Sequence, residues 1–244
     1  MFKNSYIYFI AFIVALLLTN CTSNIKEAPI LLFNGTGTSP NDVTAIKDIL
    51  SSNHLEFAEV NSAQLNQLDT NRLRKYKLLI IPGGNFIDIG KNLSVATSAN
   101  IQKAVYQGLN YLGICAGGFL AGNTKNNSFN IADTSFKFYS AEDKGIRKAA
   151  VAVANTDGTT IEHYWEDGPQ FNGWGSVVSK YPDGTPATVQ GSYGSGWVVL
   201  TGVHAEAPAS WRNEFHFTTS IEESHNYAAM LIKAAMGKIP LAHF

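Results

Sequence analysis

Short apolar runs alternate with amphipathic segments along residues 29–114. Residues 29–33 and 78–81 are uninterrupted apolar runs of strand length that end in glycine-containing turns. Residues 39–50 begin with Ser-Pro-Asn-Asp and then carry apolar residues at helical spacing, which predicts a capped helix. The same patterns predict strands at residues 55–60 and 111–114 and a helix at residues 100–107.

Strands that alternate with helices at this spacing pair in parallel, with helices on both faces of the sheet. We therefore expect an open, mostly parallel α/β sheet that binds its ligand beyond the carboxyl ends of the strands. The polar and glycine-rich segments fall at those ends, at residues 34–38, 82–86 and 115–118.

From about Ser128 the pattern changes to short alternating runs separated by turn signals. The predicted strands are residues 149–154, 160–165, 187–190 and 196–200. The last two are expected to form a hairpin through residues 191–195, and residues 221–236 a final helix with one apolar face. No repeat or low-complexity linker interrupts the chain, so we expect one domain over residues 29–244.

The N-terminal residues indicate in which cellular compartment the protein works. Lys3 precedes an uncharged apolar run over residues 6–18, which is shorter than the roughly 18–20 residues that cross a bilayer. Residues 18–21 resemble a bacterial lipobox, in which the thiol of Cys21 would receive diacylglycerol. We expect a signal peptide at residues 1–21, a tether at residues 22–28 and a membrane-anchored, extracytoplasmic protein. Asn20 stands where lipoboxes usually have Gly, Ala or Ser, so ordinary cleavage or an uncleaved anchor stays open.

Charge and cysteine content narrow the function. The net charge is −1, and the one basic stretch is residues 72–77, so we expect no nucleic-acid partner. The chain has two cysteines, and lipidation of Cys21 leaves Cys115 unpaired in an oxidising compartment. Cys115 is then either a small buried hydrophobic residue or a reactive thiol.

The surroundings of Cys115 favour a nucleophile. A nucleophile at a sharp strand-to-helix turn needs small residues two positions before and after it, and Gly113 and Gly117 meet that need. The helix N-terminus favours the thiolate. The N–H of Ala116 and an N–H of the Gly83–Gly84 turn are candidate donors to an oxyanion.

A thiolate nucleophile needs a base and a group that orients the base. Of six histidines we choose His204, which follows an apolar strand and stands two residues before Glu206. Alternate residues of an extended segment face the same side, so the Glu206 carboxylate could hold the imidazole. His216 with Glu214 is the one other candidate pair.

Two further residues are candidates for substrate binding. Asn34 ends the first strand, and Asp167 lies in an aromatic and acidic segment, residues 165–171. This segment is either a lip over Cys115 or an exposed turn with an aromatic anchor. Residues 35–37 lack the glycine spacing and the Lys-Ser/Thr pair of a phosphate loop. We expect no cofactor and no metal.

Taken together, these motifs resemble the class I glutamine amidotransferase-like superfamily, and within it the biotin-protein ligase N-terminal domain as a stand-alone bacterial lipoprotein. The motifs are residues 33–37, 81–84, 111–118, 165–171 and 203–206. The resemblance implies a flavodoxin-like three-layer α/β/α sandwich and a Cys-His-Glu triad at Cys115, His204 and Glu206. Glutamine amidotransferases usually continue the turn with a bulky residue, Gly and a polar residue, whereas this chain has Ala116, Gly118 and Phe119, which counts against glutaminase specificity.

Two functions follow from this sequence. The first is an exported hydrolase that cleaves a small amide or a peptide through Cys115. The alternative is a membrane-tethered binding or scaffold lipoprotein that keeps the fold without turnover, since a fold does not imply an activity.

Overall fold

The computed structural model describes residues 25–139 and 148–244. The strands are β1 Ile30–Phe33, β2 Phe57–Val60, β3 Leu78–Ile81, β4 Asn110–Ile114, β5 Lys137–Phe138, β6 Lys148–Asn155, β7 Thr160–Glu166, β8 Pro169–Gln170, β9 Ser176–Lys180, β10 Pro186–Tyr193 and β11 Gly196–Thr201. The helices are α2 Pro40–Ser52, α3 Ser62–Leu65, α4 Thr70–Leu73, α5 Phe86–Asn92, α6 Val95–Tyr106, α7 Ala116–Ala121, α8 Ala209–Arg212 and α9 Ile221–Gly237.

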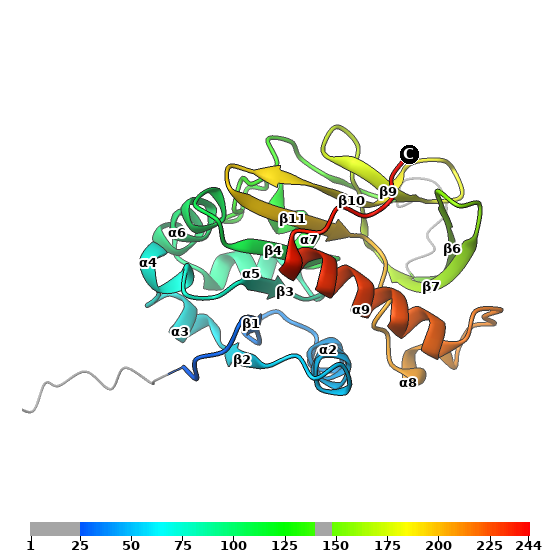
Figure 1. Ribbon diagram of the computed structural model, residues 1–244, viewed down its shortest axis with the longest axis horizontal. Helices are drawn as coiled ribbons and strands as arrows, with labels where there is room; N and C mark the ends of the chain where they lie inside the picture. Colours follow the sequence, from blue (N-terminus) through cyan, green and yellow to red (C-terminus); the bar gives the residue numbers. More distant parts are fainter. Residues whose placement is uncertain (1–24, 140–147) are drawn as a thin grey trace, which may run out of the picture.

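Nine strands form one sheet in the order β2-β1-β3-β4-β11-β10-β9-β6-β7 (Figure 1). The pairings from β2 to β11 are parallel, and those from β11 to β7 are antiparallel. The expected flavodoxin-like α/β/α sandwich with added antiparallel strands is confirmed. The antiparallel half is as large as the parallel half, because β9, which the sequence analysis missed, links the hairpin β10–β11 to β6.

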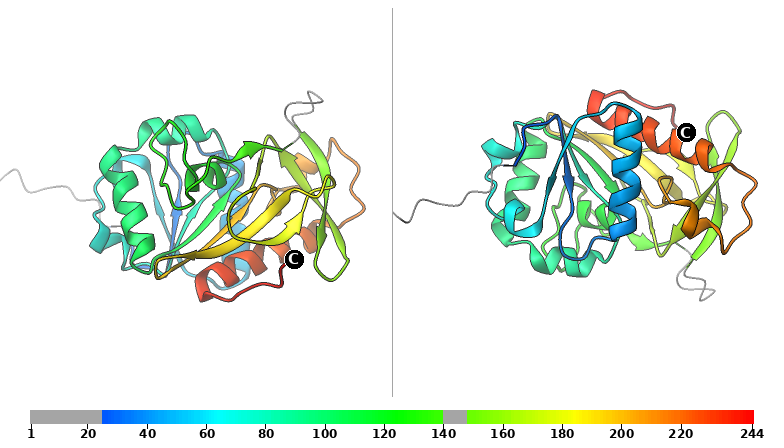
Figure 2. Two further views of the ribbon diagram at one scale, coloured as in Figure 1. Left: turned by 90° about the horizontal axis from the view of Figure 1, so that it is seen from above. Right: turned by 90° about the horizontal axis from the view of Figure 1, so that it is seen from below.

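Strand alternation builds two cores, one on each face of the sheet. Ile30 and Leu32 of β1 pack with α2 and α9, whereas Leu31 and Phe33 pack with the α4–α7 side. Figure 2 shows α2 and α9 covering one face and the α4–α7 helices covering the other. Each fully buried Leu, Ile or Phe side chain contributes about 1.5–3 kcal/mol to folding. These four are completely buried, which fixes the register of the parallel strands.

The first predicted helix forms as its sequence indicates. Ser39 is the N-cap of α2 and accepts from the backbone N–H of Asp42, and Pro40 opens the first turn. The final helix, α9, buries Tyr227 and Leu231 as expected. No helix in the part of the chain that the structure describes is both long and apolar enough to cross a membrane. The predicted signal peptide and Cys21 lie outside the described residues.

Candidate active site

Cys115 lies at the junction between β4 and α7, at the carboxyl end of the sheet. Its φ of 47° and ψ of −100° are unusual for a residue with a side chain, and such strain persists where the surroundings impose it. A Cβ on Gly117 would overlap the Ile81 carbonyl of β3, and one on Gly113 would lie 2.6 Å from Gly117. The two glycines therefore let helix and strand approach closely enough to form the turn.

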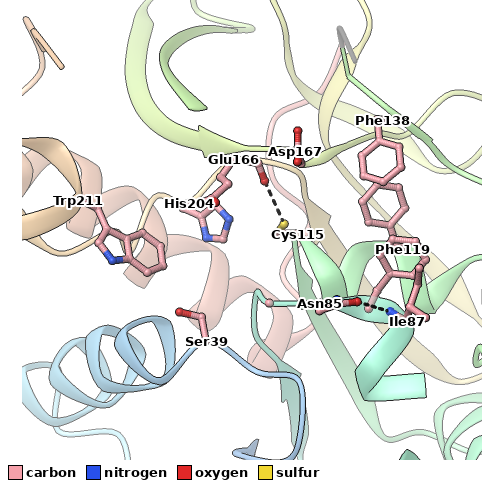
Figure 3. Close-up of a pocket in the computed structure, with 12 residues that line it drawn as sticks. Ser39, Asn85, Ile87, Cys115, Phe119, Phe138, Glu166, Asp167, His204 and Trp211 are labelled. Atoms are coloured by element: carbon pink, nitrogen blue, oxygen red, sulfur yellow. Dashed lines mark hydrogen bonds between the residues drawn. The ribbon is translucent and has the colours of Figure 1, made fainter. Parts of the chain in front are cut away.

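The thiol of Cys115 faces a cavity and is 5% exposed. Its Sγ donates to the backbone oxygen of Glu166 at 3.6 Å. Figure 3 shows Cys115 between the His204 imidazole on one side and Phe119 and Phe138 on the other. The thiol thus opens on a space that a substrate could enter.

His204 follows β11, the parallel neighbour of β4. Its backbone N–H donates to the Tyr164 oxygen at 2.8 Å, which fixes the segment against β7. Its Nδ1 lies 2.8 Å from Oε1 of Glu206, and both side chains are buried. This contact leaves Nε2 as the imidazole atom that can exchange a proton with Cys115 or with a substrate.

Asp42 joins this pair, although sequence analysis assigned it only to the first turn of a helix. The α2 N-terminus carries the Asp42 carboxylate beneath the Gly83 turn, where Oδ2 accepts the Gly83 N–H. Oδ1 lies 3.5 Å from Nδ1 of His204 and has no hydrogen-bond partner. Asp42 is completely buried, so its charge acts within a low-dielectric site.

The buried groups shift each other's ionisation. Burial and the nearby Asp42 carboxylate raise the pKa of Glu206 to about 8. Burial also opposes the ionised form of Asp42, but interactions with Glu206, His204 and the Gly83 N–H outweigh it and lower the Asp42 pKa. The two carboxyl groups therefore titrate as a coupled pair, in which burial and their mutual repulsion disfavour two negative charges at once.

Burial acts against the charged form of His204 as well. The charges of Cys115 and Glu206 and the contact with Asp42 outweigh burial and raise the pKa of His204 well above its usual value. The imidazolium form is thus favoured next to Cys115. This is the electrostatic arrangement that activates a cysteine nucleophile.

The backbone near Cys115 offers donors for an oxyanion. The N–H of Gly83 is engaged by Asp42, so this member of the predicted pair is not available. Gly84 lines the cavity at a φ of +139°, and a Cβ there would overlap the Gly37 carbonyl. Ala116, by contrast, is completely buried and does not line the cavity. Their two N–H groups remain the candidate donors to an oxyanion.

The cavity has a volume of about 470 Å³, within the range of small-molecule sites. It is lined by Ser39, Gly84, Asn85, Phe86, Ile87, Cys115, Phe119, Phe138, Glu166, Asp167, His204 and Trp211. Glu166 and Asp167, from the segment over residues 165–171, are among these lining residues.

Asn34 does not line this cavity, contrary to our expectation. Its backbone N–H donates to the Val60 oxygen and its side-chain amide to Glu59, so it continues the pairing of β1 with β2. Sequence analysis also missed Asn85 and Trp211. Asn85 caps α5, a short helix that the sequence pattern did not reveal, and Trp211 belongs to the single-turn helix α8.

Asp42, His204 and Glu206 are also the one group, among the residues that the structure describes, whose potential metal-ligand atoms lie within 4.8 Å of one another. The Gly83 N–H already occupies Oδ2 of Asp42, and the 2.8 Å contact between His204 and Glu206 is a hydrogen bond. The group is therefore organised as a proton-sharing network around the imidazole.

Comparisons with known proteins agree with this architecture. The sequence model of the family described as "Biotin-protein ligase, N terminal" matches residues 28–146. No curated protein matches the sequence. A crystal structure of a glutamine amidotransferase superposes with a TM-score of 0.63 at 17% identity, covering 86% of this chain and 99% of that chain.

Two further structures share the fold. The structure of PurLQS from Thermotoga maritima has a TM-score of 0.57 at 16% identity, covering 85% of this chain and 99% of that chain. The exo-β-1,4-mannosidase Op5Man5 from Opitutaceae bacterium strain TAV5 has a TM-score of 0.50 at 15% identity, covering 94% of this chain and 40% of that chain. The same fold therefore occurs in proteins with different names and sizes.

Proposed function

Because residues 28–146 of this chain belong to the biotin-protein ligase N-terminal family and the fold is glutamine amidotransferase-like, we propose that the protein is a cysteine-nucleophile amide hydrolase. The observation that carries the proposal is the strained Cys115 at the β4–α7 junction, facing the same cavity as His204. Strain of this kind at a cavity is typical of a functional residue.

The reaction follows from the positions of the groups. The Cys115 thiolate attacks the amide carbonyl carbon, and N–H groups of Gly84 and Ala116 stabilise the oxyanion. The C–N bond breaks as His204 gives its proton to the leaving amine, which leaves a thioester on Cys115. Water then attacks the thioester with His204 as base, and the acid leaves as the thiol re-forms. Glu206 and Asp42 hold the imidazole and favour its charged form.

A specific observation favours the alternative, a binding or scaffold protein. In this structure the Cys115 thiol donates to the Glu166 carbonyl and is almost fully buried. A thiol retained only for packing would have this environment. The two functions differ in the reactivity that they require of Cys115.

Alkylation with iodoacetamide, followed at Cys115 by mass spectrometry between pH 5 and 9, tests the proposal. We expect rapid labelling near neutral pH that falls about 10-fold in His204→Ala, because the imidazolium no longer stabilises the thiolate. His243→Ala is the matched control, since His243 is exposed and outside the cavity. A slow rate that His204→Ala leaves unchanged would support the binding protein instead.

The compartment is part of the proposal. We place the enzyme on the outer side of a membrane, attached through a lipid on Cys21. The support is the sequence of residues 1–21, which combines an apolar core with a lipobox-like end.

A further inference from the structure

Three phenylalanines form one wall of the cavity beside Cys115, which we call the phenylalanine wall: Phe86, Phe119 and Phe138. Phe86 stacks on Phe119 with ring centroids 4.7 Å apart, and Phe119 contacts Phe138 at the same separation. The rings come from α5, α7 and β5, so three separate elements converge to build this surface. Figure 3 shows Phe119 and Phe138 on the side of the cavity opposite His204 and Trp211.

The position of Phe119 ties the wall to the nucleophile. Its N–H donates to the Cys115 oxygen at 3.1 Å in the first turn of α7, so it lies one helical turn beyond the thiol. The wall and Cys115 line the same cavity, so the wall borders the space that an acyl group on Cys115 would enter. Phe119 is buried, whereas Phe138 is 40% exposed and Ile87, at the same rim, is 37% exposed. Exposed apolar side chains grouped in a cavity are typical of a ligand site.

The polar residues that line the cavity near the wall are Asn85, Glu166 and Asp167, and the contacts of the first two are internal to the protein. Oδ1 of Asn85 accepts from the N–H groups of Ile87 and Asp88, so it serves as the cap of α5. The Glu166 carboxylate accepts a hydrogen bond from the Tyr164 hydroxyl at 2.8 Å and forms an ion pair with Lys148 at 3.6 Å. The surface next to the thiol that has no polar partner to satisfy is the phenylalanine wall.

We propose that the phenylalanine wall is an acyl-group subsite for an aromatic or similarly flat apolar side chain, and that the substrate is an aryl-bearing amide rather than glutamine. This inference rests on the proposed hydrolase function, because the subsite is defined by its distance from a working thiol. A substrate ring would pack on the exposed faces of Phe86 and Phe138, as aromatic rings do at offset or tilted angles.

Two chloromethyl ketones with the same reactive group test the inference. One carries a phenylethyl tail, and the other carries the amino-acid tail of glutamine. In both, a C–S bond forms at Cys115 and chloride leaves. Each labelling rate is divided by the iodoacetamide rate of the same protein, which removes differences in thiol reactivity. We expect the full chain to prefer the phenyl probe by at least about 10-fold.

Variants locate the preference. Phe138→Ser removes the most exposed ring of the wall and should reduce the normalised phenyl-probe rate several-fold, with little change in the normalised rate of the amino-acid probe. Phe244→Ser is the matched control, since Phe244 is 53% exposed and lies outside the cavity. Phe119 is unsuitable for this purpose because it belongs to the buried core.

The outcomes separate the two proposals. Equal normalised rates for the two probes, or a preference for the amino-acid tail, would overturn the aryl subsite. The hydrolase proposal would still stand in that case if iodoacetamide labelling of Cys115 depends on His204. A phenyl preference that Phe138→Ser and Phe244→Ser both leave intact would also overturn it. If labelling by iodoacetamide does not depend on His204, the hydrolase proposal fails and the subsite fails with it.

Discussion

Asp42 links two parts of the candidate active site that come from distant parts of the chain. One carboxylate oxygen holds the Gly83 N–H, and the other lies 3.5 Å from Nδ1 of His204. The turn that carries Gly84 and the imidazole are thus positioned by the same side chain. Since Asp42 is completely buried, replacing it should change both charge and geometry.

Two substitutions at Asp42 separate these effects. Asp42→Asn can still accept the Gly83 N–H but removes the negative charge, so we expect Cys115 alkylation near pH 6.5 to slow by roughly 10-fold, which corresponds to about 1.4 kcal/mol less stabilisation of the thiolate–imidazolium pair. Asp42→Ala also leaves the buried Gly83 N–H without a hydrogen-bond acceptor. It should therefore lower the free energy of unfolding by about 1–3 kcal/mol. Iodoacetamide labelling and denaturant unfolding measure the two quantities.

Asp48→Asn on the same helix is the control, because Asp48 is exposed and lies away from the cavity. It should change neither quantity. If Asp42→Asn labels at the wild-type rate, then the buried carboxylate does not support the charged form of His204, and its role is confined to the Gly83 turn.

At the level of residues, the sequence predicted those whose roles follow from local spacing. Cys115 with its flanking glycines and the pair His204 and Glu206 are brought to one place as expected. Asp42 was missed because a helix-start acid usually remains in solvent, and only the packing of α2 against the Gly83 turn buries it. Asn34 was expected to bind substrate, but it hydrogen-bonds to β2 instead, and the sequence around Asn34 does not indicate that partner.

Strand β7 and helix α9 meet through a second buried histidine. His163 Nδ1 lies 2.7 Å from the Ser224 hydroxyl, and its ring lies 4.8 Å from that of Tyr227. Its Nε2 has no hydrogen-bond partner. Burial, with a smaller contribution from the charge of Arg212, lowers the pKa of His163 to about 3. The folded protein therefore holds this side chain neutral.

This interface predicts a pH dependence of stability. Between about pH 6.5 and pH 3 the unfolded chain binds a proton at His163 and the folded chain does not, so stability falls as the pH falls. From pH 6.5 to 4.5 the contribution is about 2 kcal/mol. His163→Gln removes the titrating group and with it this contribution to the pH dependence. The difference in unfolding free energy between variant and wild type should therefore change by about 2 kcal/mol between pH 6.5 and pH 4.5. Urea unfolding at both pH values measures it.

His216→Gln provides the comparison, because His216 is exposed on the loop before α9. Its stability curve should run parallel to that of the wild type. Parallel curves for His163→Gln as well would mean that His163 gains its proton in the folded state at ordinary pH, and that burial at this interface does not exclude the charge.

Elements were predictable where an uninterrupted pattern defined them. Strands β1, β3 and β4 and helices α2 and α9 each have a run of apolar residues at one clear period. Strand β9 has only two apolar residues among five, and α5 is a seven-residue helix with a glycine inside it. Their formation depends on tertiary partners, so local pattern could not reveal them.

In the folded molecule the carboxyl ends of β3, β4 and β11 lie side by side. The position of the candidate site could therefore be predicted from the strand pattern, although the residues that line it could not. Parallel neighbours place the Gly83 turn, Cys115 and His204 at one edge of the sheet. Other lining residues come from β5 and α5 on one side of the cavity and from α8 on the other, and these elements are short and carry no sequence period. The proposed substrate preference therefore depends on the parts of the fold that were hardest to predict.

The proposed attachment to a membrane through Cys21 can be tested on the full chain. A diacylglycerol carries two acyl chains, and two chains anchor a protein stably where a single chain binds only marginally and reversibly. We expect the wild-type protein in the membrane fraction, with a mass that corresponds to cleavage before Cys21 plus lipid. Cys21→Ser should remove the lipid mass and release the protein, or leave the precursor unprocessed.

Cys115→Ser is the matched control, because it makes the same change at the other cysteine and should leave the protein in the membrane with its lipid. If the wild-type protein carries no lipid and is recovered in the soluble fraction, Asn20 directs ordinary signal cleavage. If Cys21→Ser stays in the membrane and both proteins have the mass of the uncleaved chain, residues 6–18 act as an anchor. In an uncleaved protein Cys21 would be a second thiol, so labelling experiments on Cys115 would need site-resolved detection.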